Sequence, residues 1–140
     1  MKILILGASY GSLLSTKLLM AGHDVTLICR SKSAALINDE GTEVRIKLRD
    51  EDSHRAFRSH DLAGTLDAVI PADARPEDYD MISLAMQEPQ YSEPQVRDLM
   101  QRIAASRKPC LSIMNMPPLP FLRRIDALAE APLDMCYDDA

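Results

Sequence analysis

The first thirty residues constrain the fold most strongly, because they spell out one strand–turn–helix–strand unit. An apolar run over 2–6 stops at Gly7, and small residues follow as far as Ser12. Leucines then recur near the 3.6-residue period up to Gly22, a typical helix stop, and a second apolar run covers 24–29. Such a unit leaves backbone N–H groups free at the start of its helix, beside the end of the first strand, which suits a phosphate.

Strand-like and helix-like segments alternate through the rest of the chain. Further helices are predicted over 33–39, 92–106 and 121–129, and further strands over 43–48, 66–70, 81–86 and 111–114. Ser31 and Gly41 are expected to bound the first of these helices and Ser92 to cap the second. The charged stretch 49–62 predicts a loop or a paired strand. The alternation predicts a Rossmann-like α/β fold, doubly wound, with a mainly parallel sheet and helices on both faces.

Composition limits what such a chain does. With 140 residues, we expect one domain over 1–131 and a tail or linker over 132–140. A net charge of −5, with only four Tyr and two Phe, argues against nucleic-acid partners. We find no signal peptide and no apolar stretch approaching ~20 residues, so we expect no membrane partner and a cytoplasmic location.

The three cysteines are far apart and show no metal-ligand spacing. Cys29 and Cys110 fall in apolar runs, which predicts buried, reduced thiols in a reducing compartment. No metal site is therefore expected.

Small residues after the first strand are the first candidates for binding a ligand. The dinucleotide fingerprint is G-x-G-x-x-G, and the present loop is one residue shorter, with Ser9 near the place of the middle glycine. A serine still offers its N–H and hydroxyl to a phosphate. The predicted phosphate-binding residues are Gly7, Ala8, Ser9, Tyr10, Gly11 and Ser12. The alternative is a tight turn that needs small residues only.

The end of the second strand carries Arg30, Ser31 and Lys32. NAD sites usually place an acid here for the ribose 2′-OH, whereas these residues are donors that fit a 2′-phosphate. The sequence therefore predicts NADP rather than NAD, and the alternative is a solvated surface arginine.

The later strand ends at Met86, and Gln87 and Gln90 follow it at the same edge of the sheet. These amides would bond the ribose or a substrate, or else serve only the loop.

Several of these segments resemble the N-terminal domain of the ketopantoate reductases (2-dehydropantoate 2-reductases). The matching segments are KILILG at 2–7, GSLL at 11–14, AGHDVTL at 21–27 and RS at 30–31, with DMISL at 80–84 and IMN at 113–115. The resemblance covers most of 1–116 in outline and is specific mainly within 1–31.

The family's known chemistry assigns roles to the matching residues. The resemblance implies that NADPH binds the glycine loop and that Arg30 takes its 2′-phosphate. It also implies that Asn115 lies beside the nicotinamide and the substrate, which makes Asn115 the candidate catalytic residue, and that Gln90 matches a family glutamine. Met86 and Gln87 complete the predicted cofactor site. The implied reaction is reduction of a small 2-keto acid to a 2-hydroxy acid with NADP(H).

Three departures from the family pattern stand beside these matches. The glycine loop is short, Gln87 replaces a family lysine, and Met116 replaces the glycine after Asn115. In the family, the general-acid lysine belongs to a helical C-terminal domain beyond the present 140 residues. We therefore expect an NADP-binding domain that is incomplete as a catalyst without that domain. We also expect self-association through apolar surface left uncovered by its absence, formed by Met116, Leu119, Phe121 and Leu122.

Two other functions match parts of the same sequence. A stand-alone, non-catalytic nucleotide-binding or regulatory module fits the same residues. A short-chain dehydrogenase is suggested by the segment from Gly7 to Gly11, which is similar to that family's G-x-x-x-G-x-G loop. It fails because Leu13 replaces the last glycine, no Tyr-x-x-x-Lys pair exists, and the chain is too short.

Overall fold

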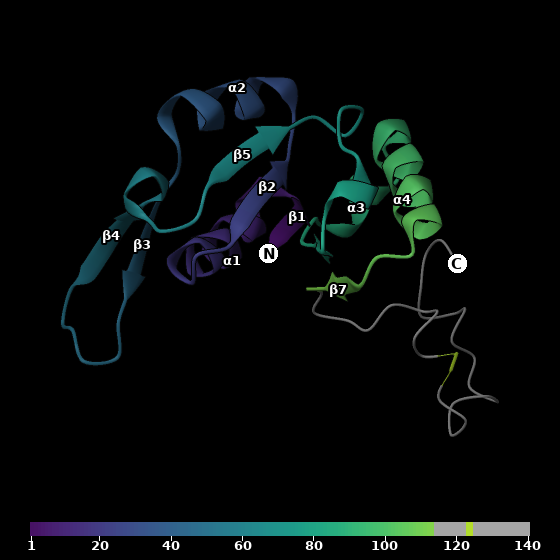
Figure 1. Cartoon of the computed structure of the whole chain (residues 1–140). Helices are drawn as coiled ribbons and strands as arrows, with labels where there is room; N and C mark the ends of the chain where they lie inside the picture. Colours follow the sequence, from purple (N-terminus) through teal and green to yellow (C-terminus); the bar gives the residue numbers. More distant parts are fainter. Residues whose placement is uncertain (114–122, 125–140) are drawn as a thin grey trace.

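Five parallel strands form the central sheet of the computed structural model, which describes residues 1–113 and 123–124 (Figure 1). In chain order they are β1 Lys2–Leu6, β2 Asp24–Ile28, β5 Leu66–Val69, β6 Met81–Leu84 and β7 Cys110–Ser112. Their order in the sheet is β5-β2-β1-β6-β7, so the chain winds outward from β1 in both directions. The predicted doubly wound sheet is confirmed, and its switch point lies at β1.

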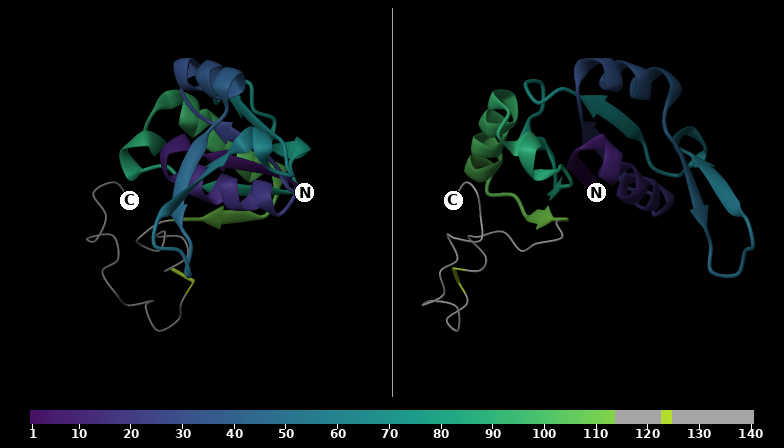
Figure 2. Two further views of the ribbon diagram at one scale, coloured as in Figure 1. Left: turned by 90° about the vertical axis from the view of Figure 1, so that its left-hand side faces the viewer. Right: turned by 180° about the vertical axis from the view of Figure 1, so that it is seen from behind.

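Helices cover both faces of the sheet (Figure 2). Each face carries its own apolar cluster, and successive residues of β1 belong alternately to one cluster and the other. Ile3 and Ile5 belong to the cluster under α1 (Ala8–Met20) and α2 (Ser31–Glu40). Leu4 and Leu6 belong to the cluster under α4 (Pro94–Ser106). Burial on both faces explains why the strands read as continuous apolar runs rather than as alternating ones.

The turn after β1 is tighter than predicted. Helix α1 begins at Ala8, so the expected loop over 7–12 is instead one glycine followed by the first turns of a helix. Gly7, with φ 104°, makes the whole turn, and its carbonyl accepts the first helical hydrogen bond from the N–H of Gly11 at 3.1 Å. Gly7 is therefore the one residue between the strand and its helix.

Two other helix starts also differ from the prediction. Arg30, not Ser31, is the cap residue of α2, while Gly41 ends that helix as expected. The segment after β6 forms a short helix, α3 (Glu88–Tyr91), where a loop was expected. Ser92 therefore ends α3 rather than capping α4, and its hydroxyl donates to the carbonyl of Pro89 at 2.6 Å.

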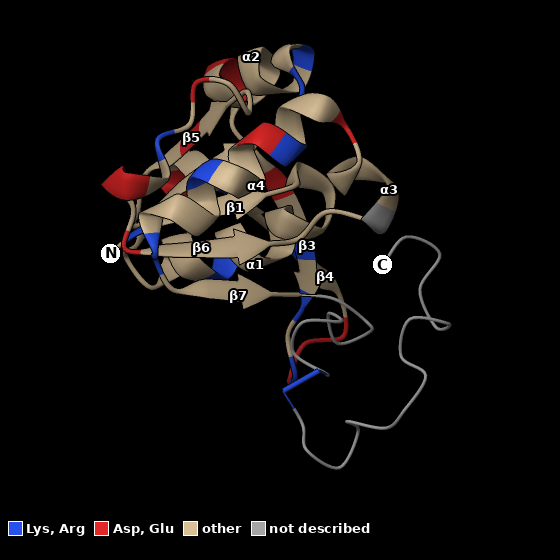
Figure 3. Ribbon diagram, turned by 90° about the vertical axis from the view of Figure 1, so that its right-hand side faces the viewer, with Lys and Arg blue, Asp and Glu red and all other residues tan. Residues whose placement is uncertain are grey.

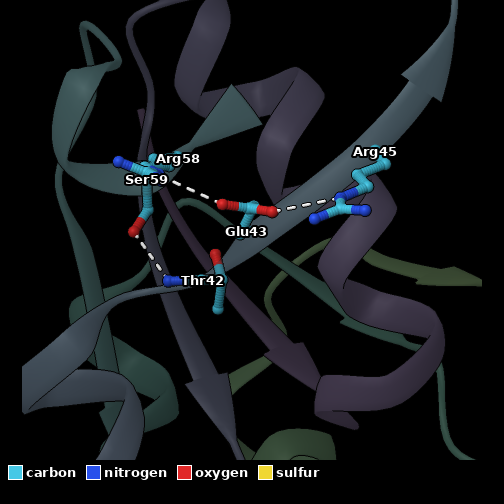
Figure 4. A network of polar contacts seen from close by, with 5 residues as sticks. All are labelled: Thr42, Glu43, Arg45, Arg58 and Ser59. Atoms are coloured by element: carbon cyan, nitrogen blue, oxygen red, sulfur yellow. Dashed lines mark hydrogen bonds and ion pairs between the residues drawn. The ribbon is translucent and has the colours of Figure 1, made fainter. Parts of the chain in front are cut away.

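A hairpin of β3 (Glu43–Lys47) and β4 (His54–Arg58) forms a separate antiparallel pair that extends away from the sheet (Figure 1). The alternating segment over 43–48 is thus a half-exposed hairpin strand, as predicted. Glu43 accepts hydrogen bonds from Arg45 at 3.2 Å and from Arg58 at 3.1 Å (Figure 4). The two guanidinium groups lower the pKa of the Glu43 carboxyl below its usual value. Short 3-10 turns at Ser59–Asp61 and Pro76–Asp78 complete the described elements.

The two cysteines of the described residues are reduced, as predicted, but neither is fully buried. Cys29 is half-buried, and that burial raises the pKa of its thiol. Cys110 is exposed, because it opens β7, the strand at one edge of the sheet. Neither is in a disulfide.

Other predicted features lie outside the described residues, namely Asn115, the apolar surface at 116–122, nearly all of the helix over 121–129, Cys136 and the tail at 132–140.

Asn38 of α2 hydrogen-bonds to the backbone of β5, the strand at the other edge of the sheet. Its amide nitrogen donates to the carbonyl of Ala68 and its Oδ1 accepts from the N–H of Ala68, both at 2.8 Å. We expect Asn38→Ala to lower the free energy of unfolding by about 2 kcal/mol, because Ala68 is buried and its carbonyl loses this partner. Urea unfolding measures the difference. Asp39→Ala, at the exposed next position of α2, should change it by no more than about 0.5 kcal/mol, and equal effects would contradict the assignment.

Candidate functional site

A pocket of about 560 Å³ opens at the carboxyl ends of β1 and β2. This is the switch point of the sheet, where doubly wound folds bind their ligands. Figure 3 shows α3 beyond the carboxyl end of β6, with α4 lying across the sheet. The residues that line the pocket are Gly7, Ala8, Ser9, Ile28, Cys29, Arg30, Ser31, Ser33, Ile70, Pro71, Met86, Gln90, Glu93, Gln95 and Val96.

Gly7 is required at the floor of this pocket for two reasons. Its φ of 104° is a conformation that L side chains rarely adopt, and a Cβ atom there would lie 2.7 Å from the carbonyl oxygen of Ala85. Its own N–H donates to the carbonyl of Ile28 at 3.0 Å, which ties the turn to β2. The first strand, the second strand and the segment after β6 therefore meet at this one residue.

The start of α1 offers backbone donors to the pocket. Because Gly11 makes the first helical hydrogen bond, the N–H groups of Ala8, Ser9 and Tyr10 have no acceptor within the described part of the chain. Ala8 and Ser9 line the pocket, and Ser9 is exposed. The free N–H groups and the helix dipole together favour an anion at this point.

Gly11 and Ser12, also predicted to bind phosphate, line neither this pocket nor its smaller neighbour. Gly11 lies on the underside of α1, where a Cβ would come within 2.8 Å of the side chain of Ile5. It therefore allows the helix to pack closely on β1. The hydroxyl of Ser12 donates to the carbonyl of Ala8 inside the helix.

A smaller pocket of about 160 Å³ adjoins the first and brings together other predicted residues. The side-chain amide of Gln87 donates to the hydroxyl of Tyr10 at 3.2 Å, so the start of α3 contacts the first turn of α1. The side chain of Gln90 accepts from the N–H of Gln87 at 3.0 Å, and Gln90 lines both pockets. The Tyr91 hydroxyl accepts from the N–H of Met86 at 3.3 Å, and burial is the main cause that raises the pKa of Tyr91.

Arg30 and Glu93 face each other across the larger pocket. The guanidinium of Arg30 lies 3.2 Å from the carboxylate of Glu93, and their side chains are 80% and 47% exposed. Of the described residues that line the pocket, they are the one cation and the one anion. Ser31 lines the pocket beside Arg30, whereas Lys32 is exposed and lines neither pocket.

Sequence reasoning missed Glu93, although a signal for it exists. Pro94 is the first residue of α4, where proline is favoured, which marks Glu93 as the cap residue. What the sequence does not reveal is that the cap lies opposite Arg30, since 63 positions separate the two residues.

A side chain of α4 holds the segment that contributes Ile70 and Pro71 to the pocket. The guanidinium of Arg102 donates to the carbonyl of Pro71 at 2.7 Å and to the carbonyl of Ala74. This wall therefore belongs to the ordered core rather than to a free loop.

Among the described residues, no group of His, Cys, Asp or Glu side chains is arranged to hold a metal ion. In the same part of the chain, every helix is too short or too polar to cross a membrane. Asn115, the predicted catalytic residue, lies outside the described residues.

A family model described as ketopantoate reductase PanE/ApbA matches residues 3–115. The chain belongs to the ketopantoate reductase PanE/ApbA family. The matched range includes every described residue of both pockets. The family inferred from the sequence is thereby confirmed.

One solved structure supports the fold. The chain is similar to the putative 2-dehydropantoate 2-reductase from Enterococcus faecalis, with 18% identity and a TM-score of 0.53 over 84% of this chain and 35% of that one. It therefore spans about a third of that protein's length. A second match is apo saccharopine dehydrogenase (L-Glu forming) from Saccharomyces cerevisiae, with 16% identity and a TM-score of 0.42 over 84% and 22% of the two chains. No curated protein sequence matches the chain.

Proposed function

We propose that this ketopantoate-reductase domain binds NADP(H) in the larger pocket and forms the nucleotide-binding part of an oxidoreductase that reduces a small 2-keto acid to a 2-hydroxy acid. One observation carries the proposal. Arg30 lies at the end of β2, on the same pocket as the free N–H groups of α1. This is where an NAD site carries an acid for the ribose 2′-OH. A guanidinium there would instead pair with a 2′-phosphate.

The described residues fit each part of such a nucleotide. A volume of about 560 Å³ lies within the usual range for small-molecule sites. The N–H groups of Ala8 and Ser9 would hold the pyrophosphate, and Arg30 with Ser31 would hold the 2′-phosphate. The amide of Gln90 would reach the ribose or the nicotinamide. When bound, NADPH would supply the hydride.

A proton donor must accompany that hydride, because reduction of a ketone generates an alkoxide. The described residues lining the pocket include neither Lys nor His. We propose that a helical C-terminal domain supplies the general acid, with 1–131 as the nucleotide domain, 132–140 as the link to it, and Asn115 beside the substrate. This chain alone should therefore not oxidise NADPH in the presence of ketopantoate or other 2-keto acids. Measurable turnover would contradict this part of the proposal.

Nucleotide preference tests the proposal directly. We expect isothermal titration calorimetry to give NADPH a dissociation constant about 10- to 150-fold below that of NADH, the range set by one charge-assisted hydrogen bond to the 2′-phosphate. The nucleotide 2′,5′-ADP, which carries the 2′-phosphate without the nicotinamide, should compete with NADPH, whereas 5′-AMP should compete poorly. Equal affinity for NADPH and NADH, or binding of neither, would contradict the proposal.

A non-catalytic nucleotide-binding module is the second candidate. It is favoured by Gln87, which stands where the resemblance places a lysine, and by the lack of a proton donor on the described pocket wall. The natural reading frame distinguishes the two. A frame that continues past Ala140 into a helical segment with a lysine-bearing helix supports the oxidoreductase, and a frame that stops there supports the module.

A further inference from the structure

The start of α4 directs the side chain of Glu93 toward Arg30 rather than toward its own helix. The backbone carbonyl of Glu93 accepts hydrogen bonds from the N–H groups of Val96 and Arg97, both at 3.0 Å. Its carboxylate makes no capping hydrogen bond to the helix. Instead it pairs with the Arg30 guanidinium at 3.2 Å. The carboxylate is therefore not needed to cap α4, and its described partner is Arg30.

The pair places two anions in competition for one cation. Arg30 is the cation among the described residues of the pocket, so a 2′-phosphate and the Glu93 carboxylate would need the same guanidinium. Because both side chains are largely exposed, the pair is weak, and a doubly charged phosphate can displace the carboxylate. A ribose with a free 2′-OH does not require that displacement.

We infer that Glu93 is a specificity-determining residue, which competes with the 2′-phosphate for Arg30 and so reduces the preference for NADP(H) over NAD(H). This inference rests on the proposed binding of NADP(H). In this site, Arg30 favours NADP(H) over NAD(H), and Glu93 reduces the ratio of the two affinities. The two side chains come from the starts of different helices, α2 and α4, so Glu93 can be replaced without changing the helix that carries Arg30.

Calorimetric titrations of NADPH and NADH into wild type and Glu93→Gln test the inference. The variant should bind NADPH about three- to tenfold more tightly, because the phosphate no longer displaces a carboxylate or approaches its charge. Its affinity for NADH should stay the same or fall. Glu40→Gln is the matched control, since it removes the same charge from the exposed far end of α2 and should change neither affinity.

A second variant guards against a folding defect. Glu93→Ser also removes the carboxylate and supplies a hydroxyl that is favoured at helix starts. Both variants should therefore show the same gain for NADPH. If neither changes the ratio of the two affinities, or if either weakens NADPH binding, competition by Glu93 is overturned.

A double-mutant cycle separates competition for Arg30 from direct repulsion of the phosphate. In an Arg30→Ala background, Glu93→Gln should give less than about half of its wild-type gain on the logarithmic scale. A full gain in that background overturns the competition. If the wild type binds NADPH and prefers it but the Glu93 variants have no effect, only this inference fails. If the wild type binds neither nucleotide, the proposed function fails and the inference falls with it.

Discussion

Arg30→Ala is expected to weaken NADPH binding about 10- to 150-fold while changing NADH binding by no more than about twofold. The guanidinium is the described cation on the pocket wall, and its loss leaves the 2′-phosphate without a charged partner. Titration of each nucleotide into wild type and variant measures both affinities.

Lys17→Ala provides the matched control for that experiment. Lys17 is an exposed cation in the last turn of α1, at the end of the helix away from the pocket. Its removal changes the net charge by the same amount and should leave the preference for NADPH intact. If Arg30→Ala weakens both nucleotides equally, or if the control weakens NADPH as much, Arg30 does not recognise the 2′-phosphate.

Gly7→Ala is expected to lower the free energy of unfolding by about 3–5 kcal/mol, from two separate costs. A backbone φ of 104° strains any L residue, and the new Cβ would lie 2.7 Å from the carbonyl oxygen of Ala85. That oxygen cannot move away freely, because the N–H of Ala85 is bonded to the carbonyl of Leu6 at 2.9 Å. Since whole domains are stable by only about 5–15 kcal/mol, this change alone threatens folding.

Gly22→Ala separates these two costs. Gly22 has a φ of 78°, but a Cβ there meets no atom within 4 Å. Gly22→Ala should therefore lower the free energy of unfolding only by the cost of backbone strain, about 1–2 kcal/mol. Urea unfolding followed by circular dichroism compares the two variants. A loss at Gly7 no larger than the loss at Gly22 would show that the turn can relax, and that close contact with the Ala85 carbonyl is not required.

Local signals explain which elements were predicted correctly. The apolar runs of β1, β2 and β6 are long enough to be read from the sequence, and Gly22 and Gly41 mark helix ends with positive φ. Helix α3 was missed because it has four residues and no periodicity. The contact between Gln87 and Gln90 stabilises its start, and nothing in a short polar segment distinguishes that arrangement from a loop.

The site was predictable where residues directly follow a strand. Gly7 and Arg30 were placed by that rule, and both line the larger pocket. Residues further into α1 were not, because the helix begins at Ala8 and the segment expected to be a loop is helical. Gly11 consequently lies against Ile5 rather than beside the pocket.

The paired hydrogen bonds of Asn38 have a consequence beyond the stability of one helix. A strand at the edge of a sheet normally offers its N–H and C=O groups to any extended segment that it meets, including the same strand of another molecule. At Ala68, in the four-residue strand β5, both groups are already bonded to one side-chain amide. An incoming strand would have to displace that amide before it could pair there. Asn38 thus makes pairing with another strand at Ala68 more costly, an effect on association rather than on folding.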